Sequence, residues 1–80
     1  MTTIPQRIAL IVEYKAKKKK DFAEIMGWKP NYLSKLISGE QGVGLTPISQ
    51  ILKKFPDIDA RWLLFGDGDM TTIKRKRRIP

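Results

Sequence analysis

The stretch DFAEIMGWKPNYLSKLISGE, residues 21–40, decides the fold because one glycine divides it into two short helical patterns. Apolar residues recur at helical spacing on both sides of Gly27: Phe22, Ala23 and Met26 before it, and Leu33, Leu36 and Ile37 after it. Gly27 can take the left-handed conformation that ends a helix, and Pro30 suits the first position of the next helix. We therefore predict one helix at residues 19–26 and another that begins at Pro30 and is ended by Gly39.

The contact between these two helices also follows from their residues. Helices that cross steeply need a small side chain where they touch, which Ala23 supplies, and a tight turn, which Gly27 supplies. Leu33 and Leu36 then face back towards Ala23, and the other apolar residues flank the contact: Phe22, Met26 and Trp28. This spacing predicts a helix-turn-helix over residues 19–38.

Helical patterns continue on both sides of this motif. Residues 4–15 have Pro5 in their first turn and a buried stripe of Ile8, Ile11, Val12 and the stem of Lys15. Leu10 and Tyr14 form a second, partly exposed stripe. The glycine-rich stretch SGEQGVGL, residues 38–45, is expected to be a loop. Thr46 is then expected to cap a fourth helix that has Pro47 in its first position and ends at Pro56. Its buried stripe is Ile48, Ile51, Leu52 and Phe55.

A short fifth helix completes the predicted domain. Asp59 can cap it and Gly66 can close it, and it holds Trp62, Leu63 and Phe65. Since no run keeps the period-2 alternation of a sheet, the fold class is all-α, a compact five-helix bundle at residues 1–70. Residues 71–80, TTIKRKRRIP, have no periodicity and dense charge, so we expect a basic tail that is disordered alone or begins a linker.

The composition limits the function. The chain has 80 residues, a formal net charge of +8, no cysteine and no histidine, which removes thiolate metal sites and the commonest general base. Lysines at positions 15 and 17–20 form one basic block and residues 74–78 form another. Such charge favours a polyanionic partner, most often nucleic acid, although lysine runs can also be plain solvated loops. No apolar run is long enough for a signal peptide or a membrane span, so we expect a soluble protein that is not exported.

Two stretches of the chain resemble a known family. Residues 21–40, together with ILKKFPDIDARWLLFGDGDM at residues 51–70, resemble the DNA-binding domain of Cro/C1-type regulators, the XRE family, and the ending resembles prophage-type repressors. The resemblance implies a lambda-repressor-like five-helix fold and a transcriptional regulator, a repressor, of phage, prophage or mobile-element type. It also implies operator binding as a homodimer and no catalysis. From the sequence we further expect no cofactor, metal, membrane or small-molecule substrate, and a location in the cytoplasm of a bacterial or phage-infected cell, associated with the nucleoid.

One face of the predicted third helix is the candidate reading surface. It carries Pro30, Asn31, Ser34, Lys35 and Ser38. Asn31 suits a bidentate contact with adenine and Lys35, one turn later, a contact with guanine, whereas Ser34 can reach a base or a phosphate. Pro30 could touch a thymine methyl group or only start the helix. Asn31 and Lys35 could also be ordinary solvated positions.

Phosphate contacts are expected around this face. The candidates are Lys18, Lys19, Lys29, Tyr32, Ser38 and Gln41. Tyr32 could instead pack partly buried, and the loop around Gln41 could make no contact. Family members usually have Ser or Thr and then Gln at the start of the second helix, where this chain has Lys18 and Lys19. A lysine cannot accept the capping hydrogen bond, worth about 1 kcal/mol, so either a phosphate lies against these lysines or the helix starts later, at Lys20 or Asp21.

The sequence allows more than one role for the tail, for two aromatic residues and for the domain itself. The tail could be a basic arm, a linker to a further domain or a solvated terminus. Trp62 and Phe65 could belong to the core or to a dimer interface on the fourth and fifth helices. An antitoxin-like or protein-interaction module with the same fold is the main rival function. An RNA-binding role lacks exposed aromatic runs, and an enzyme lacks a nucleophile–base pair or a nucleotide-binding loop.

Overall fold

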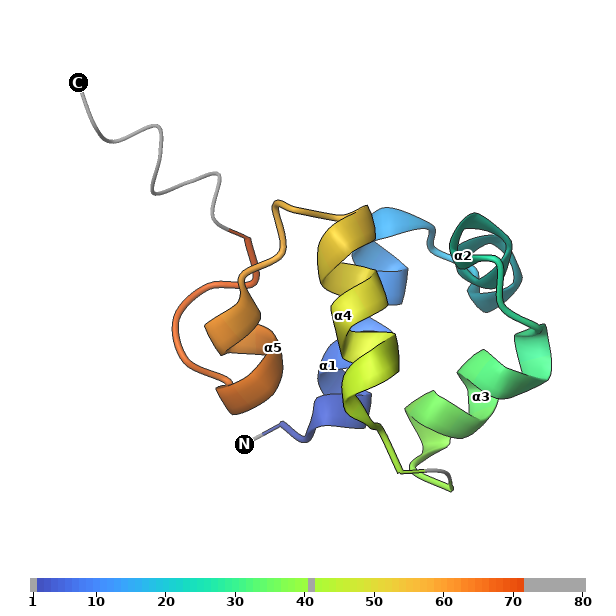
Figure 1. The fold of residues 1–80 in the computed structure, drawn as a ribbon, viewed down its shortest axis with the longest axis horizontal. Coiled ribbons are helices and arrows are strands. Elements are labelled where there is room, and N and C mark those ends of the chain that lie inside the picture. The colour runs from blue at the N-terminus through green and yellow to red at the C-terminus, as the bar shows by residue number, and fades with distance from the viewer. Residues whose placement is uncertain (1, 41, 72–80) are drawn as a thin grey trace.

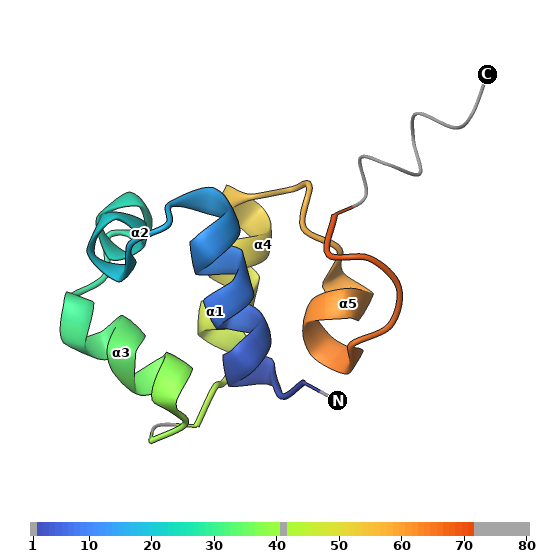
Figure 2. The same cartoon turned by 180° about the vertical axis from the view of Figure 1, so that it is seen from behind.

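The computed structural model describes residues 2–40 and 42–71 and has five α-helices there (Figure 1). They are α1 (Ile4–Lys15), α2 (Lys19–Met26), α3 (Pro30–Ser38), α4 (Leu45–Lys54) and α5 (Ala60–Phe65). Within these residues the only pairing of extended backbone is an isolated antiparallel bridge between Ile58 and Thr71. The prediction of an all-α fold is confirmed for these residues. Figures 1 and 2 show α2 and α3 towards one end of the molecule, α5 towards the other, and α1 and α4 between them.

The start of α1 is fixed by a reciprocal cap that the sequence analysis missed. The Thr3 hydroxyl accepts from the backbone N–H of Gln6 at 3.3 Å, and the Gln6 side-chain oxygen accepts from the backbone N–H of Thr3 at 2.9 Å. This capping box satisfies two N–H groups that have no partner inside the helix. Pro5 lies in the first turn, as predicted.

The predicted start of α4 is wrong by two residues. The helix begins at Leu45 after Gly44, so Thr46 lies inside it rather than capping it, and Pro47 is its third residue. Because the first N–H groups of any helix lack intrahelical acceptors, a proline at this third position costs no hydrogen bond. Pro47 is also buried, so its ring contributes to the packing that holds this end of α4.

The core joins all five helices. Its buried members are Ile8, Ile11, Val12, Phe22, Ala23, Leu33, Leu36, Ile48, Ile51, Ile58 and Leu63. Every apolar residue predicted for the buried stripe of α1 and for the contact between α2 and α3 lies in or against this core. Lys15, predicted to join that stripe by its stem, is half-buried and pairs with Asp57 at 2.7 Å. Ile58, in the connection before α5, was not predicted, because it stands outside any helical repeat.

Phe65 does not belong to the core. It is 64% exposed, whereas Trp62 packs partly buried against the core, so the core reading holds for Trp62 alone. Phe65 is the last residue of α5 and lies 5.8 Å from the Arg61 guanidinium, one turn earlier on the same helix.

Candidate nucleic-acid interface

The outer face of α3 is open to solvent. Pro30, Asn31, Ser34, Lys35 and Ser38 are all exposed, while Leu33 and Leu36 on the opposite face are fully buried. Asn31 and Lys35 stand four residues apart, so their side chains lie one above the other on one side of the helix. The predicted grouping of these five side chains on one accessible face is therefore present in the structure.

The turn between α2 and α3 fixes where that face points. Gly27 has a left-handed φ of 76°, its N–H donates to the Glu24 carbonyl at 3.1 Å, and the Trp28 N–H donates to the Ala23 carbonyl at 2.8 Å. This is the Schellman arrangement that closes a helix. Ala23 thus contributes both a fully buried small side chain and the carbonyl that accepts from Trp28.

Aromatic rings support the same turn from the inside. The Trp28 ring lies edge-on to the Tyr32 ring of α3 at 5.2 Å and to the Phe22 ring of α2 at 6.3 Å between centroids. Phe22 in turn stacks on Phe55, next to the end of α4, at 5.6 Å. Tyr32 is half-buried, which fits the packing alternative, whereas Lys29 before it is exposed.

The start of α2 is cationic and uncapped. Lys18 occupies the N-cap position without a side-chain cap, and the helix begins at Lys19, so the alternative of a later start is wrong. Lys17 has φ of 68° and is the one non-glycine residue with positive φ in the described part of the chain. Ala16 and Lys17 both donate their N–H to the Val12 carbonyl at 2.8 Å, which turns the chain sharply from α1 into α2.

Ser38 is already engaged at the end of α3. Its hydroxyl donates to the Lys35 carbonyl at 3.2 Å and accepts from the Glu40 N–H at 3.3 Å. A phosphate contact by Ser38 would have to replace the first of these bonds. Gln41 lies outside the described residues, as does the tail beyond Thr71.

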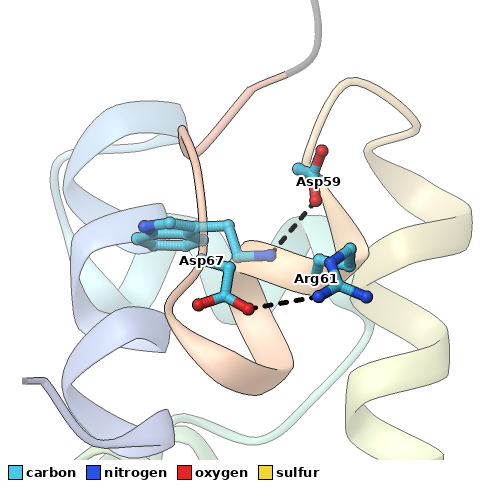
Figure 3. A network of polar contacts seen from close by, with 4 residues as sticks. Asp59, Arg61 and Asp67 are labelled. Atoms are coloured by element: carbon cyan, nitrogen blue, oxygen red, sulfur yellow. Dashed lines mark hydrogen bonds and ion pairs between the residues drawn. The ribbon is translucent and has the colours of Figure 1, made fainter.

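Charge is divided between the two ends of the molecule. Residues 17–38, at the α2–α3 end, contain six lysines and two acids, whereas residues 57–70, around α5, contain four aspartates and one arginine. At the α5 end, Arg61 pairs with Asp67 at 3.3 Å and Asp59 accepts from the Trp62 backbone N–H at 3.1 Å, which confirms its predicted cap (Figure 3). Among the described residues, the α2–α3 end is therefore the more cationic, and its charge would attract a polyanion.

Two features of this site were missed from the sequence, a side-chain hydrogen bond and a left-handed lysine. The Trp28 indole N–H donates to the Gln50 side-chain oxygen of α4 at 2.8 Å, and neither residue was predicted to bond. Lys17 was predicted only as one of a block of charges, because a left-handed lysine has no sequence signature. A tryptophan next to a helix-ending glycine is also taken as an apolar residue first, since its N–H is a minor part of its surface.

Comparison with protein-family models, curated proteins and solved structures found no match to this chain. The resemblance to Cro/C1-type regulators therefore stays a prediction from the sequence. None of the helices in residues 2–40 and 42–71 has the length and apolar character to cross a membrane. Over the same residues, no three His, Cys, Asp or Glu side chains gather as a metal site would require.

Proposed function

We propose that this chain binds double-stranded DNA at specific sequences and regulates transcription, as a repressor of the prophage type. The observation that carries the proposal is the exposed face of α3, where Asn31 and Lys35 stand one turn apart on the basic end of the molecule. Two short helices joined by a three-residue turn with glycine match the helix-turn-helix, whose second helix enters the major groove.

The roles within this surface follow from side-chain chemistry. Asn31 would read adenine and Lys35 guanine in the major groove, because their donors and acceptors fit those base edges. Lys18, Lys19 and Lys29 would contact phosphates, which set the position of α3 on the duplex. Pro30 starts α3 and Tyr32 packs on Trp28. These structural roles account for both residues without a contact to DNA.

Selection of binding sites from random duplex DNA tests the proposal. The wild type should enrich a defined sequence, and the double variant Asn31→Ala with Lys35→Ala should lose that preference while keeping most of its non-specific affinity. Lys54→Ala is the matched control, because it also removes one positive charge but lies at the end of α4. If the double variant and the wild type enrich the same sequence, α3 is not the reading helix.

The same selection tests the proposed dimer. A two-fold symmetric dimer places its reading helices in successive major grooves, so enriched sequences should be palindromic with half-sites about 10–10.5 base pairs apart, or a multiple of that. Sedimentation of the complex should then give two chains per site. A wild type that binds all duplexes alike would favour the rival protein-interaction module instead.

A further inference from the structure

The turn before the reading face of α3 is joined to α4 by one side-chain hydrogen bond. α3 packs closely on α1 and α2, and the described residues show no comparable packing between α3 and α4. In the described part of the chain, the bond from the Trp28 indole N–H to the Gln50 side-chain oxygen, 2.8 Å long, is the hydrogen bond that joins the turn or α3 to α4. A change at this bond would therefore act on the placement of α3 relative to α4.

Trp28 is suited to carry such a constraint because it contacts three helices at once. Its ring meets Phe22 of α2 and Tyr32 of α3, and its N–H meets Gln50 of α4. Tyr32 follows Asn31 directly, so a tilt of the Trp28 ring that moves Tyr32 also moves the proposed adenine reader. Because the Trp28 side chain has only a few rotatable bonds, a change in its orientation at Gln50 also displaces the ring at Tyr32.

Gln50 is exposed and lies at the rim of a shallow hollow that it shares with Met26, Lys53 and Lys54. A bond at the surface adds little to stability, since water can replace either partner. Even this small free energy favours one orientation of the indole among those that ring packing alone allows.

We infer that Trp28, held by Gln50, is a positioning residue that sets the orientation of α3 for base reading. The inference rests on the proposed DNA binding for its functional part. Without the bond, α3 samples orientations that place Asn31 and Lys35 incorrectly, and specific binding must select the correct one. Non-specific binding to phosphates has no such requirement, so specificity falls while general affinity is kept.

The test compares Gln50→Met, which removes the acceptor at similar side-chain length, with Gln50→Glu, which keeps it. In the free protein, residual dipolar couplings report the orientation of α3 relative to α1 and α4. Gln50→Met should change the couplings of α3, and Gln50→Glu should leave them as in the wild type. The indole N–H of Trp28, identified by its loss in Trp28→Phe, should exchange faster with solvent in Gln50→Met only.

The second readout is the specificity ratio, the dissociation constant for random duplex divided by that for the selected site. This ratio should fall about three- to tenfold in Gln50→Met and Trp28→Phe, the range set by losing one net hydrogen bond. It should be retained in Gln50→Glu, whose added negative charge weakens binding to all duplexes alike. Asp59→Ala, which removes the cap of α5 at the far end, is the control for a general loss of stability and should keep the ratio.

The outcomes separate the two proposals. Unchanged α3 couplings in Gln50→Met would overturn the positioning role, whatever the chain binds. Changed couplings in Gln50→Met, together with a wild type that shows no sequence preference, would uphold the positioning of α3 and overturn the proposed function. Changed couplings with an unaltered specificity ratio would overturn the link from orientation to base reading.

Discussion

Arg7 of α1 is buried against the end of α5, where its Nε atom donates to the Leu63 carbonyl at 2.9 Å. Its Nη2 atom donates to the Leu64 carbonyl at 3.3 Å, and its Nη1 atom donates to the hydroxyl of Thr2 at 3.0 Å. Carbonyls in the last turn of a helix have no intrahelical donor, and they carry the negative end of the helix dipole. One guanidinium therefore closes α5 and connects it to α1 and to the start of the chain.

Replacing this guanidinium should destabilise the domain. In Arg7→Met the apolar stem is kept, but the carbonyls of Leu63 and Leu64 lose their donor in a buried place. We expect the free energy of unfolding to fall by about 1.5–3 kcal/mol, the range for charge-assisted hydrogen bonds. Urea denaturation followed by circular dichroism measures the change.

Arg61→Met is the matched control for this prediction. It makes the same exchange at an arginine that is 74% exposed and pairs with Asp67 at the surface. Exposed pairs contribute about 0–1 kcal/mol, so this variant should stay close to the wild type. Equal losses in the two variants would show that arginine content, and not the closure of α5, accounts for the effect.

The contact of Arg7 with α5 could not have been predicted from the sequence. The stripe of Ile8, Ile11 and Val12 was predictable because burial repeats with the helical period. A charged residue beside that stripe is ordinarily assigned to solvent, and nothing local to position 7 reveals carbonyl groups on a helix at the other end of the sequence. The fold class followed from periodic patterns, whereas this closure depends on a long-range contact.

The candidate site also combines features that local sequence patterns predict with one that depends on a long-range contact. The exposed face of α3 and the glycine-ended turn were predictable from spacing and from the conformations that glycine allows. The start of α4 was placed two residues late because a threonine followed by proline is a strong local signal for a helix start. The bond from Trp28 to Gln50 joins separate parts of the chain, so it could not be predicted from local sequence patterns.

Lys17 holds a conformation that a glycine would adopt without strain. Its φ of 68° brings Cβ close to the backbone, which costs an ordinary residue about 1–2 kcal/mol. Lys17→Gly removes that cost, but glycine also raises the conformational entropy of the unfolded chain, which offsets part of the gain. We therefore expect a net rise in unfolding free energy of about 0.5–1 kcal/mol. Thermal and urea denaturation should both show it.

Lys17→Ala controls for the charge. It removes the ammonium group from the basic block at residues 17–20 but keeps Cβ, so its stability should stay within about 0.5 kcal/mol of the wild type. A rise in Lys17→Ala equal to that in Lys17→Gly would mean that charge repulsion, and not backbone strain, is what the substitution relieves.

Ala23 sets the distance between α2 and α3. It is fully buried, so Ala23→Leu would add carbon atoms to a contact that has no room for them. We expect a loss of about 1–3 kcal/mol in unfolding free energy from overpacking. Glu24→Leu, the same new side chain at the adjacent exposed position, should change stability by about 0.5 kcal/mol or less. A tolerated Ala23→Leu would show that the two helices do not depend on this close contact.

Lys18 and Lys19 should act through phosphates and without sequence preference. Each phosphate neutralised by a protein contributes about 0.9 to the slope of log affinity against log salt concentration. If both lysines contact phosphates, Lys18→Ala with Lys19→Ala should weaken binding to every duplex by a similar factor and reduce the slope by up to about 2. Fluorescence anisotropy with labelled duplex, measured between about 50 and 200 mM salt, gives the slope.

Lys53→Ala with Lys54→Ala removes the same charge from the last turn of α4 and should change the slope less. Equal slopes in the two double variants would show that the start of α2 acts through the general field of the protein and makes no phosphate contact of its own.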